Sequence, residues 1–351
     1  MSIRNLLNGG RKSNDPSINN DRITKYLSRR NEGIFFAELS PKYLDKTGAA
    51  ALLASVPVPI GSDEESPEPD TVIIALNMGR VVGGDPSFPY RTQYLAFIEM
   101  VYGENADRAM IAEGAKYGGK EDYEAACMFF RAALILNSKS KDALYLYGRS
   151  CLDAYNKGSE DEAYIGLFKA ESIDCFELLT MIHEDYEMGY YFLGYGYVNL
   201  GLYLKAKLTW DRFMELTDGT SNVELQELRE EIGGRINRLD VPIKIENATN
   251  EILRGNYSYG RDELIKYTSG KYSEWWPLWY YLAIAEESLG HASEAIEDYK
   301  TALKYTPSNI EIMKNLAAVL QAAGRGDEAE KYRKKIMVVE ENLKSEQITD
   351  M

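Results

Sequence analysis

The sequence predicts an all-α protein built from repeated pairs of antiparallel helices. Beyond about residue 105, apolar residues recur every three to four positions, which is the spacing of amphipathic helices. A fixed arrangement of apolar, small and aromatic residues also returns at an interval of 34 residues. Residues 1–104 lack this interval, so we expect an N-terminal extension there, a stack of helical repeats over 105–343 and a polar tail at 344–351.

The composition is typical of a protein that does not enter a membrane. Of the 351 residues, 45% are hydrophobic and 27% are charged, with a mean hydropathy of −0.37. No apolar run approaches the roughly 18 residues that a membrane span needs. The first residues, MSIRNLLNGGRKSNDPS, contain no apolar core of the length found in signal peptides. We therefore expect a cytoplasmic protein without a membrane partner.

Cysteine and histidine are scarce. The three cysteines, Cys127, Cys151 and Cys175, form no C-x-x-C pair, and the two histidines, His183 and His291, are far apart in the sequence. This usage is typical of a reducing compartment and gives no ligand set for a metal. The cysteines fall at or beside helix positions that pack, so we expect buried structural thiols, with no metal and no cofactor.

Charge is spread unevenly along the chain. The net charge is −15, but residues 1–50 carry nine Lys and Arg against five acidic residues, which leaves +4 there and −19 over the rest. A body this acidic repels a phosphate backbone, which argues against nucleic acid as a partner. The basic start is expected to meet an acidic surface, either on a partner or on this chain itself.

The clearest repeats lie near the C-terminus. The 34 residues from Trp276 and the next 34 from Ile310 align without a gap. Small residues in this pattern allow two antiparallel helices to approach closely, and a glycine after the first helix can adopt the left-handed conformation that ends it. The positions that match are Leu282 and Leu316, Ala283 and Ala317, Gly290 and Gly324, and Ala295 and Ala329.

The same frame recurs upstream. Units beginning near residues 105, 141 and 187 place a glycine at one equivalent position of the first helix: Gly114, Gly148 and Gly194. The match weakens between them and Trp276, where 222–239 reads as one helix and 243–268 as a degenerate hairpin.

These units resemble the tetratricopeptide repeat, over roughly residues 105–343. The resemblance implies a right-handed superhelical solenoid that acts as a non-catalytic scaffold or adaptor. In this family a partner peptide or protein lies along the concave face. Family members that grip a terminal carboxylate use Lys, Asn and Arg at positions that are mostly Tyr here, so that clamp is not expected.

The resemblance also implies candidate partner-binding residues. A groove rich in tyrosine suits an extended or helical peptide with apolar character, because tyrosine offers a large contact area at low entropic cost. The alternative is that these tyrosines pack against the N-terminal segment or neighbouring helices. Carried across from the groove-lining positions of the family, the candidates are Tyr145, Arg149, Tyr191, Tyr195, Tyr280 and Lys314.

The first third of the chain is harder to interpret. We expect a polar start to about residue 20, a helix over DRITKYLSRR, an Ala/Leu helix near 47–56 and an acidic, proline-rich linker near 57–70. Segments 71–82 and 90–103 are predicted helices, although a strand is equally compatible with the first. This region is either a small separate domain or an extension that caps the repeats, and we favour the extension.

Motifs for chemistry are lacking. The sequence contains no phosphate-binding G-x-x-x-x-G-K-[ST] loop, no H-E-x-x-H and no G-x-S-x-G, and the glycines of GYGYVNLG fall on repeat positions. An enzyme with its site in the first third is one alternative. The other is a peptide-responsive transcriptional regulator with an N-terminal DNA-binding segment, because residues 20–50 are basic.

Overall fold

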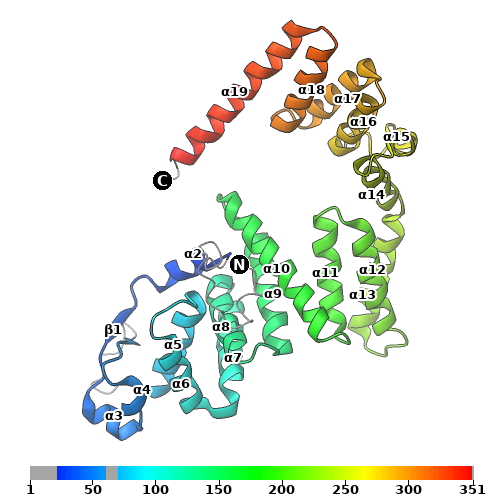
Figure 1. Ribbon diagram of the computed structural model, residues 1–351. Coiled ribbons are helices and arrows are strands. Elements are labelled where there is room, and N and C mark those ends of the chain that lie inside the picture. The colour runs from blue at the N-terminus through cyan, green and yellow to red at the C-terminus, as the bar shows by residue number, and fades with distance from the viewer. Residues whose placement is uncertain (1–21, 61–69, 350–351) are drawn as a thin grey trace. The chain divides into compact units, whose positions relative to one another are not determined.

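The computed structural model describes residues 22–60 and 70–349. The expected polar start, with Arg4, Arg11 and Lys12, and most of the expected linker lie outside the described residues. The chain divides into two compact units: unit 1 comprises residues 1–200 and 208–229, and unit 2 comprises 201–207 and 230–351. The two helices of each hairpin run antiparallel to each other, which confirms the predicted all-α class of stacked helical hairpins (Figure 1).

Unit 1 contains the upstream repeats. Each predicted hairpin is present, and the second helix of the middle hairpin is the longest of the set, with 21 residues. The helices are α7 (Ala106–Gly118) with α8 (Tyr123–Leu136), α9 (Lys141–Lys157) with α10 (Glu162–Ile182), α11 (Glu187–Asn199) with α12 (Tyr203–Leu216), and α13 (Val223–Arg238). The division between the units passes through α12 and α13.

Unit 2 contains the C-terminal repeats. The segment with the weakest pattern also forms a hairpin, but its second helix has only 8 residues. The last helix continues through the expected polar tail as far as Thr349. The elements are α14 (Asp240–Leu253), α15 (Tyr257–Leu264), η4 (Ile265–Tyr267), α16 (Trp276–Ser288), α17 (Ala292–Tyr305), α18 (Ile310–Ala322) and α19 (Gly326–Thr349).

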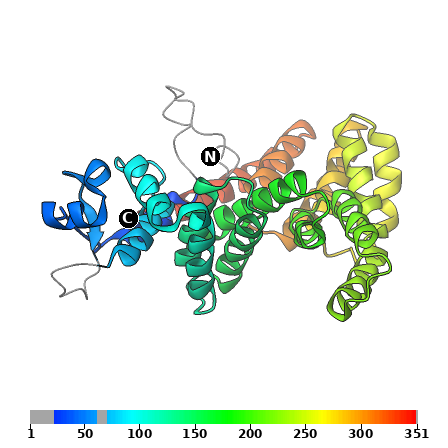
Figure 2. The same cartoon turned by 90° about the horizontal axis from the view of Figure 1, so that it is seen from below.

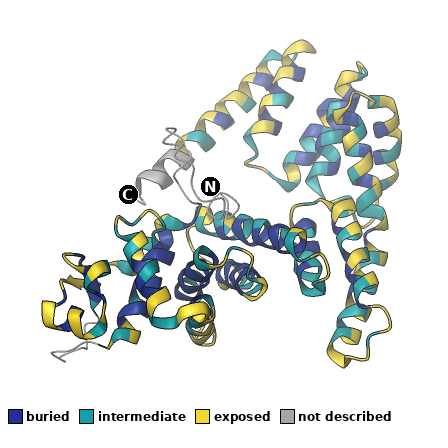
Figure 3. Ribbon diagram, turned by 60° about the horizontal axis from the view of Figure 1, so that its bottom comes forward, coloured by how far each residue is buried: buried dark blue, intermediate teal, exposed yellow. Residues whose placement is uncertain are grey.

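A glycine facing an aromatic ring sets the spacing inside each hairpin of unit 1. A Cβ added at Gly114 would lie 2.7 Å from Phe130, one at Gly148 would lie 3.0 Å from Phe176, and one at Gly194 would lie 2.1 Å from Trp210. All three rings are almost fully buried. The buried residues line the facing sides of the paired helices, as Figure 3 shows in dark blue. The small residues therefore serve close helix packing, as the pattern predicts.

The ends of the helices follow from local sequence. Asp122, Ser140 and Asp161 each precede a helix and accept hydrogen bonds from its first free N–H groups. Gly290 and Gly324 follow the first helices of the last two hairpins with φ of 84° and 76°. The predicted left-handed helix ends are thus confirmed.

The N-terminal part of unit 1 differs from the sequence interpretation in two places. Residues 58–60, expected in a linker, form a strand that pairs antiparallel with residues 35–37, because Val58 is buried against the core. The helix expected near 47–56 is limited to 50–53, after a separate helix that ends at Gly48. The elements are α2 (Thr24–Leu27), η2 (Ser28–Asn31), β1 (Phe35–Ala37), α3 (Pro41–Thr47), α4 (Ala50–Leu53), β2 (Val58–Ile60), α5 (Thr71–Gly84), α6 (Arg91–Tyr102) and η3 (Gly103–Asn105).

The segment open to a strand interpretation is helix α5, which contacts both α8 and α6; Figure 2 gives the view of these helices from below. Gly79, Gly83 and Gly84 all lie on this helix, and a Cβ at Gly83 would fall 1.8 Å from the carbonyl oxygen of Met128. The first hairpin is thereby covered by residues that precede it in the sequence. A domain boundary at residue 104 remains a prediction.

Candidate partner-binding surfaces

Two of the predicted residues, Tyr145 and Arg149, meet aromatic side chains from the next hairpin. Tyr145 contacts Tyr186 edge-on at 5.6 Å and Phe192 at 6.0 Å between ring centroids. The Arg149 guanidinium lies 4.4 Å from the centroid of the Phe192 ring and 3.7 Å from an oxygen of Asp153. Tyr145, Arg149, Tyr186 and Phe192 are all half-buried, and we call them the α9–α11 aromatic face.

Charge reinforces this face. The Lys141 ammonium group lies 4.8 Å from the centroid of Tyr186, so two cations sit over aromatic rings within it. Burial raises the pKa of Tyr186 to about 12, and the hydroxyl therefore stays protonated as a hydrogen-bond donor. The face thus combines flat apolar area with hydrogen-bonding groups.

Tyr191 and Tyr195 lie one helical turn apart on α11, and their rings are 5.2 Å apart. Tyr191 packs at 5.6 Å from Phe213, and Tyr195 packs edge-on at 5.1 Å from Trp210. The indole of Trp210 donates a hydrogen bond to the carbonyl oxygen of Tyr191 at 3.1 Å. Both tyrosines are therefore partly covered by packing contacts and partly exposed at the surface.

In unit 2, Tyr280 has a clear packing role. Its side chain is 8% exposed, and its hydroxyl donates to Glu311 at 2.8 Å and accepts from Asn315 at 3.2 Å. Burial, with a smaller contribution from Glu311, raises the pKa of Tyr280. These contacts join α16 to α18, whereas a role in partner binding remains a prediction.

Lys314 is the most exposed of the six candidates, and its ammonium group lies 3.6 Å from Glu340 on α19. The structure thus groups the four candidates of unit 1 around α11 and places the other two on α16 and α18. Sequence reasoning missed Tyr186 and Phe192, which lie outside the groove-lining positions of the family. The run of aromatic residues from Tyr186 to Phe192 was the available signal.

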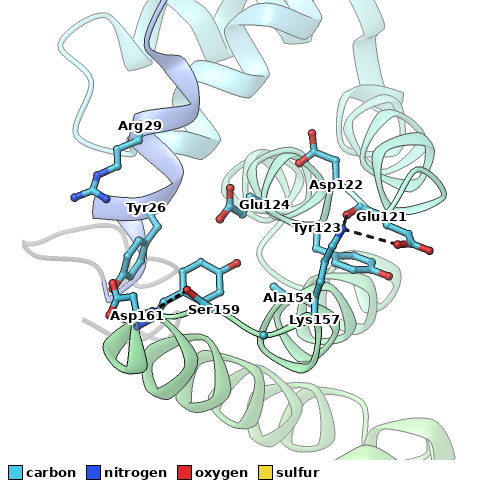
Figure 4. A pocket seen from close by; sticks show the side chains of 12 residues that line it. Tyr26, Arg29, Glu121, Asp122, Tyr123, Glu124, Ala154, Lys157, Ser159 and Asp161 are labelled. Atoms are coloured by element: carbon cyan, nitrogen blue, oxygen red, sulfur yellow. Dashed lines mark hydrogen bonds and ion pairs between the residues drawn. The ribbon is translucent and has the colours of Figure 1, made fainter. Parts of the chain in front are cut away.

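A pocket of about 440 Å³ lies at the ends of the hairpins of unit 1, beside α2 and η2 (Figure 4). The hydroxyl of Tyr26 donates to Asp161 at 2.7 Å, and Lys157 reaches the carbonyl oxygen of Glu121 at 3.1 Å. Burial, together with the hydrogen bond to Asp161, raises the pKa of Tyr26 to about 12. Conversely, the bond from Tyr26 lowers the pKa of Asp161.

Charged side chains near this pocket form ion pairs between segments that are far apart in the sequence. Arg30 pairs with Asp122 at 2.5 Å, and Arg22 pairs with Asp174 at 3.0 Å. Basic residues at 22–30 therefore contact acidic residues of the same chain, one of the two outcomes expected for the basic start. Asp122 and Asp161, which line the pocket, thus already have partners within the chain.

The described cysteines and candidate metal ligands can be assessed directly. All three cysteines are buried, as predicted, and burial raises the pKa of Cys151 and Cys175 well above that of a reactive thiol. Residues 22–60 and 70–349 contain no group of three or more His, Cys, Asp or Glu that could hold a metal ion. Within the same ranges, no helix has both the length and the apolar character to cross a membrane.

Comparison with known proteins agrees with the repeat architecture. Residues 288–336 match the model of the tetratricopeptide repeat family, so the chain contains tetratricopeptide repeats in its C-terminal part. No curated protein matches the chain in sequence.

Solved structures show weaker likenesses. A crystal structure of MamA protein is 17% identical with a TM-score of 0.28, covering 68% of this chain and 93% of that one. MamA 41-end from Desulfovibrio magneticus RS-1 is 11% identical with a TM-score of 0.28, covering 69% and 98%. The P58(IPK) TPR domain is 13% identical with a TM-score of 0.44, covering 87% and 79%. At these values the likenesses add no argument to the fold described above.

Proposed function

We propose that this chain is a non-catalytic, cytoplasmic scaffold that binds a segment of a partner protein on the α9–α11 aromatic face. The observation that carries the proposal is the half-exposed cluster of Tyr145, Phe192 and Tyr186 with Arg149 stacked on it. Aromatic and arginine side chains dominate the energetics of protein interfaces. Tetratricopeptide repeats generally bind proteins or peptides, which supports the same class of function.

The DNA-binding alternative gains no support from the described residues. Arg22 and Arg30 of the basic segment are paired with Asp174 and Asp122. Lys25 and Arg29 lie over the ring of Tyr26. These contacts engage the positive charge that a phosphate backbone would need.

Affinity capture with the full chain tests the proposal. A variant with Tyr145→Ala and Arg149→Ala should retain at least about tenfold less of a captured partner protein, because two central contacts are lost. Tyr259→Ala is the matched control, since it removes an exposed tyrosine, 59% accessible, from α15. Circular dichroism should show the same helix content in all three proteins.

Equal retention by the wild type and the double variant would move the binding surface away from α9 and α11. Loss of partner in the Tyr259→Ala control as well would mean that the loss in the double variant is not specific to this face.

A further inference from the structure

A second groove lies in unit 2, where the hairpin formed by α14 and α15 meets α16 and α17. Helix α15 has 8 residues and is followed directly by η4. A groove of about 500 Å³ lies beside η4, α16 and α17. It is lined by Ile265, Thr268, Trp279, Leu282, Glu286, Ser293, Glu294, Glu297 and Asp298.

The floor of this groove is apolar. Trp279 is half-buried, and its indole N–H donates to the carbonyl oxygen of Ser273 at 2.6 Å, which fixes the ring. Leu282 is buried beside it, while Ile265 at the edge remains 41% exposed. A fixed indole with aliphatic neighbours is a surface on which the methylene stem and planar head of a long side chain can lie.

The carboxylates above this floor are not all neutralised. Glu286 accepts from Arg261 at 2.6 Å and pairs with His291 at 2.6 Å, and Glu297 pairs with Lys300 at 3.0 Å. Among the described residues, Glu294 and Asp298 form no ion pair. Glu294 and Asp298 therefore line the groove without an ion-pair partner in the described part of the chain.

The pKa of Asp298 is raised in this groove. Burial, followed by Glu286 and Glu294, raises its pKa from 3.8 to about 7, even though Arg261 acts in the opposite direction. Burial is thus the main reason that this carboxyl group keeps its proton, and the neighbouring carboxylates add to it. A cation delivered to the groove would relieve the repulsion, which makes the groove complementary to positive charge.

We propose that this groove binds an arginine side chain presented by an extended segment of a partner protein. The guanidinium would lie at Asp298 and Glu294, and its stem would lie on Trp279 and Leu282. Arginine fits because its planar cation pairs with carboxylates in a fixed geometry and also stacks on an indole ring. The inference rests on the protein-binding function proposed above and adds a second site, which recognises a basic side chain of the partner. The residues of this site lie outside the α9–α11 aromatic face.

NMR titration of the full chain with a short capped peptide, in which one arginine is flanked by leucines, tests the proposal. The indole N–H signal of Trp279, identified with Trp279→Phe, should shift, whereas that of Trp210 should not. The same peptide with glutamine in place of arginine should bind at least about tenfold more weakly, because the charged hydrogen bonds are lost. Binding should weaken as the pH falls below about 7, since Asp298 then gains its proton.

The pocket variant carries Asp298→Asn and Glu294→Gln, and should bind the arginine peptide about tenfold more weakly. Asp298→Asn should not unfold the chain, because a folded-state pKa of about 7, above the unfolded 3.8, means that ionisation destabilises the fold as pH rises. The matched control, Glu224→Gln with Glu227→Gln on α13, replaces two carboxylates at exposed positions and should bind like the wild type.

Three results would overturn the proposal: equal binding of the arginine and glutamine peptides, equal loss in the pocket and control variants, or no shift of Trp279 at millimolar peptide. A Tyr145→Ala, Arg149→Ala variant separates the two proposals, since it should lose the partner of the aromatic face and keep the response of Trp279.

Discussion

At the scale of single residues, Gly83 has the least room for a Cβ among the described glycines of unit 1. An added Cβ would lie 1.8 Å from the carbonyl oxygen of Met128, and that atom belongs to the backbone of α8, which has no side-chain freedom to give way. We expect Gly83→Ala to lower the free energy of unfolding by about 3 kcal/mol or more, because α5 has to move off α8. Chemical denaturation measures the change.

Gly166→Ala in α10 is the control for this substitution. Nothing lies within 4 Å of a Cβ at that helical position, so alanine should stabilise the chain by up to about 1 kcal/mol. If Gly83→Ala were neutral as well, the close contact between α5 and α8 would be refuted.

At the scale of elements, the start of α10 carries a long-range contact. Asp161 accepts from the backbone N–H groups of Ala163 at 2.8 Å and Tyr164 at 3.1 Å, and from the hydroxyl of Tyr26 at 2.7 Å. Asp161→Ala should cost about 1–2 kcal/mol of stability, as the loss of a helix cap does. Because the pKa of Asp161 is lowered from 3.8, its contribution is present above that pH and is lost as the pH falls through the folded pKa.

Tyr26→Phe separates the two roles of Asp161, because it removes the long-range bond and leaves the cap. The double variant should show less than the sum of the single losses in urea denaturation. Strict additivity would show that α2 gains nothing from this bond.

At the scale of the whole molecule, stacked hairpins contact mainly their neighbours, so damage should stay local. Leu316, fully buried in α18, packs in the core shared by α16, α17, α18 and α19. Leu316→Ala should destabilise this core by about 2–5 kcal/mol. Amide hydrogen exchange should accelerate in α16–α19 and stay unchanged in α7–α10.

Val338→Ala on α19 is the control, because that side chain is 56% exposed and contributes little to a core. Faster exchange in α8 as well as α18 would show instead that the two units unfold as one.

The sequence by itself determined the hairpins, their order and the close contacts within them. Gly114, Gly148 and Gly194 hold the same position in their hairpins, and each faces an aromatic ring of the next helix in the chain. Gly290 and Gly324 end their helices for an equally local reason, which is that glycine adopts a positive φ without strain. The repeat pattern also gave Tyr145 and Arg149 as candidate partner-binding residues.

Only the tertiary structure decided which residues surround Tyr145 and Arg149. Phe192 joins Tyr145 and Arg149 across two hairpins, and Tyr26 reaches Asp161 across 135 residues. The groove around Asp298 likewise brings together residues of η4, α16 and α17. Such contacts join segments that no repeat interval relates, and their energy comes from burial and charge pairing that exist only once the chain has folded.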